Sequence, residues 1–174
     1  MLGTIKGLAL DDLNKSDEAI KAYDKAIEIN PHDSLAWCNK GLALDHLNKS
    51  YEAIKAFDKA IEINPQDSKA LNGKGNALVD LGKYDEAIKA YDKLIELNPN
   101  DSDVWNNKGN ALGDLGKSDE ALKAYDKAIE LNPQDSVAWY NKANALNKLN
   151  KFDESIKAYD KAIEINPQLR SLAQ

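Results

Sequence analysis

The sequence has very little cysteine and no long apolar stretch, and both absences narrow the possible classes of protein. A single cysteine, Cys38, excludes an internal disulfide and a metal site built from several cysteines. No segment approaches the roughly 20 consecutive apolar residues that a membrane-spanning helix requires. The opening stretch MLGTIKGLAL lacks the basic region, the long apolar run and the cleavage site of a signal peptide. We therefore expect a cytoplasmic protein with no membrane partner.

Arginine is almost absent as well, since Arg170 is its one occurrence and the net charge of the chain is −6. Binding to the phosphates of a nucleic acid needs clustered lysine and arginine, which displace counterions. The composition therefore predicts no nucleic-acid partner. With 43% hydrophobic and 30% charged residues, the chain is instead typical of a helix-rich globular protein.

Proline is scarce too, and all its occurrences share one register. Each proline ends a copy of the same ten-residue stretch, such as AYDKAIEINP or AYDKLIELNP, and the copies lie 34 residues apart: Pro31, Pro65, Pro99, Pro133 and Pro167. A fixed period of this length indicates stacked structural repeats. Positions within the repeat are counted below from Ser34 as position 1.

Each repeat contains two stop signals and one start signal for helices. Position 15 holds asparagine or glycine, which tolerate the left-handed conformation found just after a helix: Asn14, Asn48, Gly82, Gly116 and Asn150. Proline at position 32 ends a second helix. Aspartate at position 34, followed by serine, is a residue type that is preferred at a helix N-cap. The pattern predicts two helices per repeat, over about positions 1–14 and 18–31.

Small and aromatic residues recur where two helices must approach each other. Position 8 is glycine or alanine, and position 24 is aromatic in every copy: Tyr23, Phe57, Tyr91, Tyr125 and Tyr159. We predict that these rings fill the space between neighbouring helix pairs. A single pair cannot bury this apolar surface, whereas stacked pairs can.

These landmarks, together with tryptophan at position 4 and alanine at position 20, resemble the tetratricopeptide repeat. The resemblance covers five copies, over 1–33, 34–67, 68–101, 102–135 and 136–169, with a C-terminal remnant at 170–174. It implies an all-α fold, an alpha-solenoid in which antiparallel helix pairs stack into a right-handed superhelix. It further implies one domain over 1–169 that acts as a non-enzymatic protein-interaction scaffold.

One departure from the family is a lysine at position 7, in the middle of the apolar side of the first helix: Lys6, Lys40, Lys74, Lys108 and Lys142. Two interpretations remain open. Either the stem packs while the amine reaches a carboxylate or carbonyl, which we favour, or the lysine forms an ion pair between repeats that sets their stacking register.

The remaining face of the first helices lines a concave groove in the family, and here it is rich in asparagine. Asparagine is a mediocre helix former, so its abundance on one helix face needs a reason. Its carboxamide offers a donor and an acceptor, which match the main-chain groups of an extended peptide. We therefore predict a peptide-binding groove at Asn39, Asn72, Asn76, Asn106, Asn107, Asn110, Asn141 and Asn144. The alternative is that these amides bond only locally or to water.

Acidic residues lie near the ends of the same helices, where they form a predicted acidic groove rim: Asp45, Asp80 and Asp114. This rim favours a neutral or basic segment as partner. The other interpretation is an ordinary solvated edge whose charge the following lysines compensate.

The sequence does not support a carboxylate-binding clamp or a catalytic site. No frame of repeats supplies the lysines and arginines with which co-chaperone repeats hold a C-terminal carboxylate. Cys38 and His46 lie two turns apart, but no third group orients them as a nucleophile and its base. We expect no enzyme activity, no metal and no cofactor.

The two ends of the repeat array lack a polar capping helix, which solenoids generally need for solubility. The sequence therefore leaves two functions open. The first is a scaffold that receives an extended segment along the groove. The second is a structural module that associates with itself, end to end, and leaves the groove unused.

Overall fold

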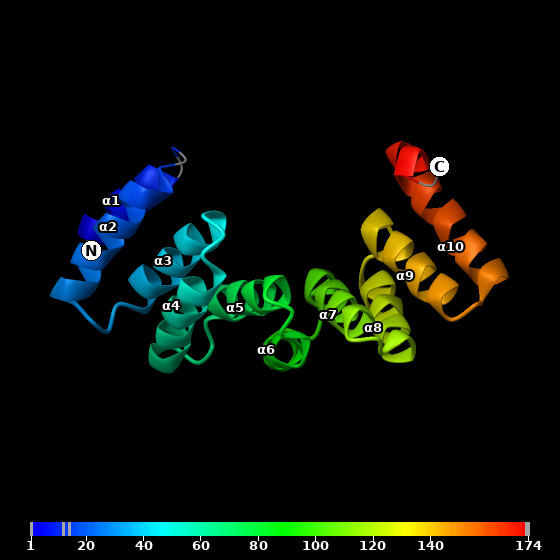
Figure 1. Cartoon of the computed structure of the whole chain (residues 1–174), viewed down its shortest axis with the longest axis horizontal. Coiled ribbons are helices and arrows are strands. Elements are labelled where there is room, and N and C mark those ends of the chain that lie inside the picture. The colour runs from blue at the N-terminus through cyan, green and yellow to red at the C-terminus, as the bar shows by residue number, and fades with distance from the viewer. Residues whose placement is uncertain (1, 12, 14, 173–174) are drawn as a thin grey trace. The chain divides into compact units, whose positions relative to one another are not determined.

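The structure of the protein is a computed structural model, which describes residues 2–11, 13 and 15–172. The regular secondary structure of that part of the chain is all helical (Figure 1), with these elements: α1 Leu2–Asp11, α2 Ser16–Ile29, α3 Ser34–His46, α4 Ser50–Ile63, α5 Ser68–Asp80, α6 Tyr84–Leu97, α7 Ser102–Asp114, α8 Ser118–Leu131, α9 Ser136–Lys148, α10 Phe152–Ile165 and the 3-10 helix η1 Pro167–Leu172. None of these helices combines the length and the apolarity needed to cross a bilayer.

The start and stop signals of the repeat act as predicted, with bounds that differ by a residue: in the later four repeats the first helix ends at position 13, and every second helix ends at position 30. Aspartate at position 34 is the N-cap, because Asp135 accepts hydrogen bonds from the backbone N–H groups of Val137 and Ala138 at 2.9 and 3.2 Å. Position 15 has positive φ in four repeats: Asn48, Asn150, Gly82 and Gly116. Asn14 lies outside the described residues. The second helices begin at position 17, one residue earlier than predicted, after a lysine that gives no side-chain cap.

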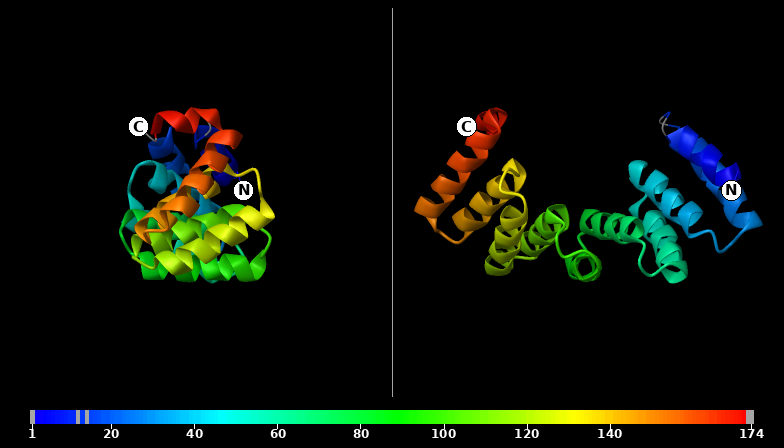
Figure 2. Two further views of the ribbon diagram at one scale, coloured as in Figure 1. Left: turned by 90° about the vertical axis from the view of Figure 1, so that its right-hand side faces the viewer. Right: turned by 180° about the vertical axis from the view of Figure 1, so that it is seen from behind.

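The chain forms two compact units, Met1–Ala90 and Tyr91–Gln174, and their boundary falls inside α6. In the first unit α1 packs on α2 and α3 on α4, while α2 and α4 also contact the first helix of the following repeat. The second unit repeats this arrangement with α7 on α8, α8 on α9 and α9 on α10, as the view from behind also shows (Figure 2, right). The predicted all-α stack of helix pairs is confirmed within each unit. The single domain over 1–169 stays a prediction.

The aromatic residue at position 24 fills the junction between repeats, as predicted. The Phe57 ring is fully buried between Gly41 of its own repeat and Gly73 of the next. A methyl group at either glycine would come within 2.6 Å of a ring carbon. The glycines are therefore needed for close approach, which offsets their cost of ~1 kcal/mol inside a helix.

The recurring lysine at position 7 reaches back to the preceding repeat. Its amine lies 2.6–2.7 Å from an aspartate oxygen at position 25 of that repeat: Lys40–Asp24, Lys74–Asp58, Lys108–Asp92 and Lys142–Asp126. Both interpretations of the lysine are therefore realised, since the amine reaches a carboxylate and this carboxylate belongs to the neighbouring repeat. The same contact in each of these four places gives the stack a repeated register.

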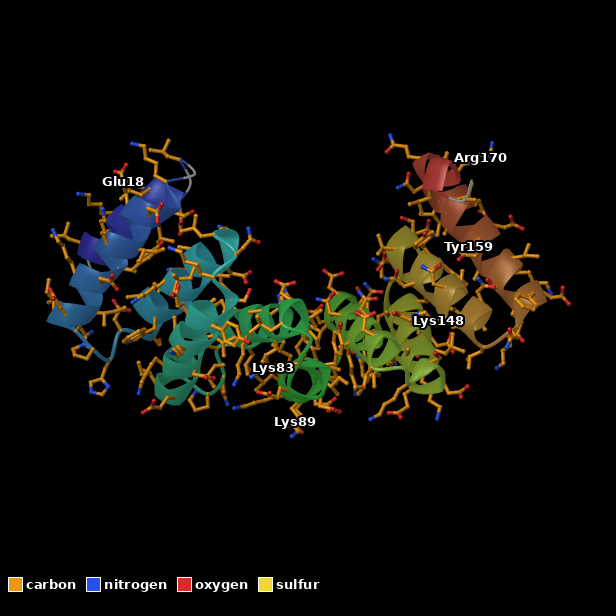
Figure 3. All side chains as sticks on the ribbon, in the orientation of Figure 1. Glu18, Lys83, Lys89, Lys148, Tyr159 and Arg170 are labelled. Atoms are coloured by element: carbon orange, nitrogen blue, oxygen red, sulfur yellow. The ribbon has the colours of Figure 1, made fainter. Side chains whose placement is uncertain are left out.

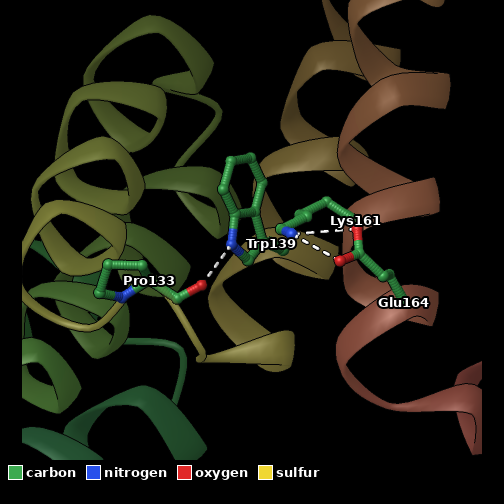
Figure 4. Close-up of polar contacts among 4 residues, drawn as sticks. All are labelled: Pro133, Trp139, Lys161 and Glu164. Atoms are coloured by element: carbon green, nitrogen blue, oxygen red, sulfur yellow. Dashed lines mark hydrogen bonds and ion pairs between the residues drawn. The ribbon is translucent and has the colours of Figure 1, made fainter.

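Tryptophan at position 4 ties the first helix to the loop before it. The Trp139 indole N–H donates to the Pro133 carbonyl at 3.1 Å (Figure 4), and Trp37 and Trp105 make the same bond. The Lys142 amine lies 5.3 Å from the centre of the Trp139 ring, within the range of a cation–π contact. These contacts hold the lysine in place between its carboxylate partner and the indole.

Candidate functional site

In the second unit, two of the predicted groove asparagines bond to each other across neighbouring repeats. Asn141 on α9 donates from Nδ2 to Oδ1 of Asn106 on α7 at 3.1 Å. Asn106 is 8% exposed, whereas Asn141 is half-buried. Asn106 therefore holds the two first helices together and presents little surface to a ligand.

Two further groove asparagines are oriented by tyrosines of their own repeat. The Tyr125 hydroxyl donates to Oδ1 of Asn110 at 2.9 Å, and the Tyr159 hydroxyl, on α10 (Figure 3), donates to Oδ1 of Asn144. A buried phenol needs such an acceptor, which gives the asparagine a structural task. Because the amide oxygen faces the tyrosine, the Nδ2 donor of each asparagine lies on the opposite side of the group.

Asn107 differs from the other predicted groove asparagines of the second unit, whose side chains are all hydrogen-bonded within the scaffold. It is half-buried on α7, and no hydrogen bond joins its side chain to another residue of the described chain. Both its donor and its acceptor are therefore left for water or a ligand.

In the first unit, the predicted asparagines differ widely in exposure. Asn39 on α3 is 2% exposed, and its buried Nδ2 has no hydrogen-bond partner among the described residues. Asn72 on α5 is half-buried, with Oδ1 equally unpartnered, while Asn76 is exposed. Asn39 is thus enclosed by the scaffold, and Asn72 and Asn76 are the members of this unit that reach the surface.

A hollow of about 360 Å³ opens in the first unit beside α1 and the first turn of α3. Thr4, Ile5 and Leu8 line it, and they occupy the repeat positions at which later copies carry groove asparagines. Asp33, His32 and Leu35 close its other side. The first-helix face is therefore hollowed at this end and more apolar than in the later repeats.

The acidic rim residues differ in burial, since Asp45 is the only one of the three that is partly buried. Asp45 at the end of α3 is half-buried, and its Oδ1 has no partner among the described residues. Burial raises the pKa of this carboxyl, and the charge of nearby Asp80 raises it further, while His46 opposes the shift. Asp80 and Asp114 are exposed. A cationic group placed beside Asp45 would stabilise the ionised form of this carboxyl, which its burial and Asp80 disfavour.

Cys38 has the environment of a structural cysteine. It is 1% exposed, and burial, followed by the charge of Asp67, raises the pKa of its thiol to about 12. The thiolate is the nucleophilic form, so this side chain is unreactive at neutral pH. His46 is exposed, and Cys38 with His46 does not form an activated pair.

Sequence reasoning did not foresee the roles of two positions, although the repeats contain the signal for both. Aspartate is present at position 25 in every copy and is the partner of the recurring lysine. Asparagine at position 9 occurs in the three last repeats, each of which has tyrosine at position 24, whereas the repeat with Phe57 has Leu42 at position 9. This pairing of side chains within the repeat indicates a hydroxyl–amide bond. The first repeat has Tyr23 with Leu8, and its hydroxyl donates to Asp11 instead.

Two family models match the chain, and both are described as tetratricopeptide repeat. One matches residues 5–33 and 34–67, and the other matches 72–136 and 106–169. None of the curated proteins matches the sequence.

Solved structures with a similar fold include a crystal structure of MamA, with 24% identity, a TM-score of 0.89 and coverage of 95% of this chain and 96% of that chain. MamA 41-end from Desulfovibrio magneticus RS-1 has 18% identity, a TM-score of 0.91 and coverage of 96% and 94%. YrrB, described as a TPR protein with an unusual peptide-binding site, has 27% identity, a TM-score of 0.82 and coverage of 92% and 83%. The likeness to MamA shows a shared fold alone.

Proposed function

Since this chain belongs to the tetratricopeptide repeat family, we propose that it is a protein-interaction scaffold whose first helices hold an extended peptide segment of a partner. The observation that carries the proposal is the hydrogen bonding of the asparagine side chains on α7 and α9. The Asn107 side chain makes no hydrogen bond within the described chain, and the side-chain oxygens of Asn110 and Asn144 accept hydrogen bonds from tyrosines. The peptide-binding site described for YrrB supports the same class of ligand.

The chemistry of these amides fits the main chain of the ligand rather than its side chains. Asn110 and Asn144 present Nδ2 donors, which pair with carbonyl oxygens of an extended segment. Asn107 can donate to a carbonyl and accept from an N–H group. Each neutral hydrogen bond contributes ~1 kcal/mol net, so a few of them support affinity of roughly micromolar order.

Charge adds a preference for a neutral or basic segment. Asp45 and Asp80 in the first unit, and Asp114 in the second, lie at the ends of the first helices. A lysine or arginine beside Asp45 would stabilise the ionised form of a carboxyl that burial now disfavours.

The proposal is tested with a library of extended peptides, from which binders are selected and their dissociation constants measured. We expect basic and neutral binders to outnumber acidic ones, with the preference weakening as salt screens the rim. Asn107→Ala should weaken capture about fivefold to tenfold, because one or two hydrogen bonds are lost. Its free energy of unfolding should change by less than ~0.5 kcal/mol.

Lys89→Ala, an exposed substitution on α6 (Figure 3), is the matched control and should leave capture unchanged. Asn107 is preferred over Asn141 as the probe, because removing Asn141 would also leave buried Asn106 without its donor. Unchanged capture by Asn107→Ala, or the absence of any binder in the library, would overturn the proposal.

A further inference from the structure

The inner junctions between repeats are built from the same two half-surfaces. The first helix contributes alanine or valine at position 3 and alanine at position 10, all at most 5% exposed: Ala36, Ala43, Ala70, Ala77, Val104, Ala111, Ala138 and Ala145. It also contributes the lysine at position 7, which pairs with the aspartate at position 25 of the preceding second helix. One junction thus needs an apolar strip and one ion pair.

The front face of α1, which carries Leu2, Ile5, Lys6 and Ala9, is a half-surface of the first kind. No other helix of the described chain supplies its partner. Leu2 and Ile5 are 87% and 59% exposed, and Ala9 is exposed where every later copy buries an alanine. No ion pair joins Lys6 to another residue of the described chain, although its four counterparts are all paired. This face therefore combines an open apolar strip with an unused cation.

The back face of α10 is the complementary half-surface. Ile156 is 58% exposed, whereas Leu122 at the same repeat position is 9% exposed, and Ile20 packs against the cluster of Ala43. Asp160 is exposed and has no ion pair within the described residues. This face has an apolar strip and an unused anion, in the register that the front face of α1 requires.

We propose that the front face of α1 in one copy of this chain packs on the back face of α10 in a second copy. The register is that of the inner junctions, with Lys6 paired to Asp160, Ala9 on Ile156 and Ile5 beside the Tyr159 ring. A second copy is the occupant because one chain carries both halves, matched in charge as well as in apolar surface. Such a contact is heterologous, so it joins further copies head to tail.

The helix η1 bears on this junction, because it directly follows α10 and packs on it. Leu172 at its end falls at position 3 of a sixth repeat, the same position that Leu2 occupies in the first. The first turn of α1 therefore takes the place of the end of η1 when the copies join. Lys6, Ile5 and Ala9 contact the part of α10 nearer its N-terminus, so these contacts do not involve η1.

The test is an exchange of charges between two variants of the whole chain, followed by sedimentation velocity up to millimolar concentration. Lys6→Asp places two aspartates in each junction, and Asp160→Lys places two lysines there. Each variant alone should associate at least about tenfold more weakly than the wild type. An equimolar mixture should recover wild-type association, because every mixed junction again holds one lysine and one aspartate.

Lys89→Asp and Asp119→Lys, both exposed and carried by α6 and α8, are the matched controls and should associate like the wild type. A wild type that is monomeric at millimolar concentration would overturn the proposal. So would a mixture that associates no better than its components. Peptide capture concerns the first-helix face and should persist in all four variants, so the two proposals fail independently.

Discussion

At the scale of single residues, a tyrosine hydroxyl decides which way an asparagine amide points. Tyr125 and Tyr159 fix the oxygens of Asn110 and Asn144, and the donors face away from the tyrosines as a result. An asparagine that is already oriented loses less conformational entropy when it binds a ligand. The tyrosines therefore prepare the donors for the carbonyl groups of a bound segment.

Cys38 offers a prediction at the same scale. Because the pKa of its thiol is about 12 in the folded chain, iodoacetamide should alkylate Cys38 very slowly at pH 8 and rapidly once the chain is unfolded in urea. The folded pKa lies above the unfolded value. The protonated thiol therefore supports folding below pH ~9, and this support is lost as the pH rises toward 12.

The matched variant is Cys38→Ala, which removes the titrating group. The difference in free energy of unfolding between the wild type and this variant should shrink as the pH rises above ~9. Alkylation of the native chain as fast as of the unfolded chain would contradict the assigned burial of Cys38.

At the scale of helices, the contact between a first helix and the ring at position 24 sets how closely the elements pack. On α7, a methyl group at Gly109 would lie 2.5 Å from the Tyr125 ring, whereas one at Gly113 would lie 3.8 Å from the Tyr125 hydroxyl. The first distance forces the ring to move, and the second is an ordinary contact. The two glycines of one helix therefore have opposite tolerance for a side chain.

We expect Gly109→Ala to lower the free energy of unfolding by ~1–2 kcal/mol through overpacking. Gly113→Ala should raise it by up to ~1 kcal/mol, because alanine is the better helix former. Urea denaturation of the two variants measures both effects against the same wild type. Equal effects of one sign would show that Tyr125 does not limit the approach of α7 and α8.

The elements were largely predictable from the sequence, because glycine, asparagine, proline and aspartate mark helix ends by local chemistry. Position 15 and position 32 therefore located the turns almost to the residue. The fate of each asparagine was not predictable in the same way. Asn39, Asn106 and Asn107 are the same residue type on equivalent helices, yet only contacts with neighbouring repeats decide which amide is buried, bonded or open.

At the scale of the whole molecule, the repeats share one kind of junction, so the stability of the chain is a sum of repeat and nearest-neighbour terms. This arrangement separates two surfaces. The face of the first helices carries the proposed segment-binding amides, and the faces of α1 and α10 carry the proposed contact between copies. A change to one surface should therefore leave the other intact.

The central claim is that the amides of the first helices recognise the main chain of a bound segment. Its most direct measurement uses a selected peptide and a series of analogues in which one backbone amide at a time is replaced by an ester. We predict that one ester near Asn107 weakens binding about fivefold to tenfold, since it removes an N–H donor. The same ester should have no effect on binding to Asn107→Ala. Equal affinities for every ester analogue, or an ester effect that persists in Asn107→Ala, would contradict the claim.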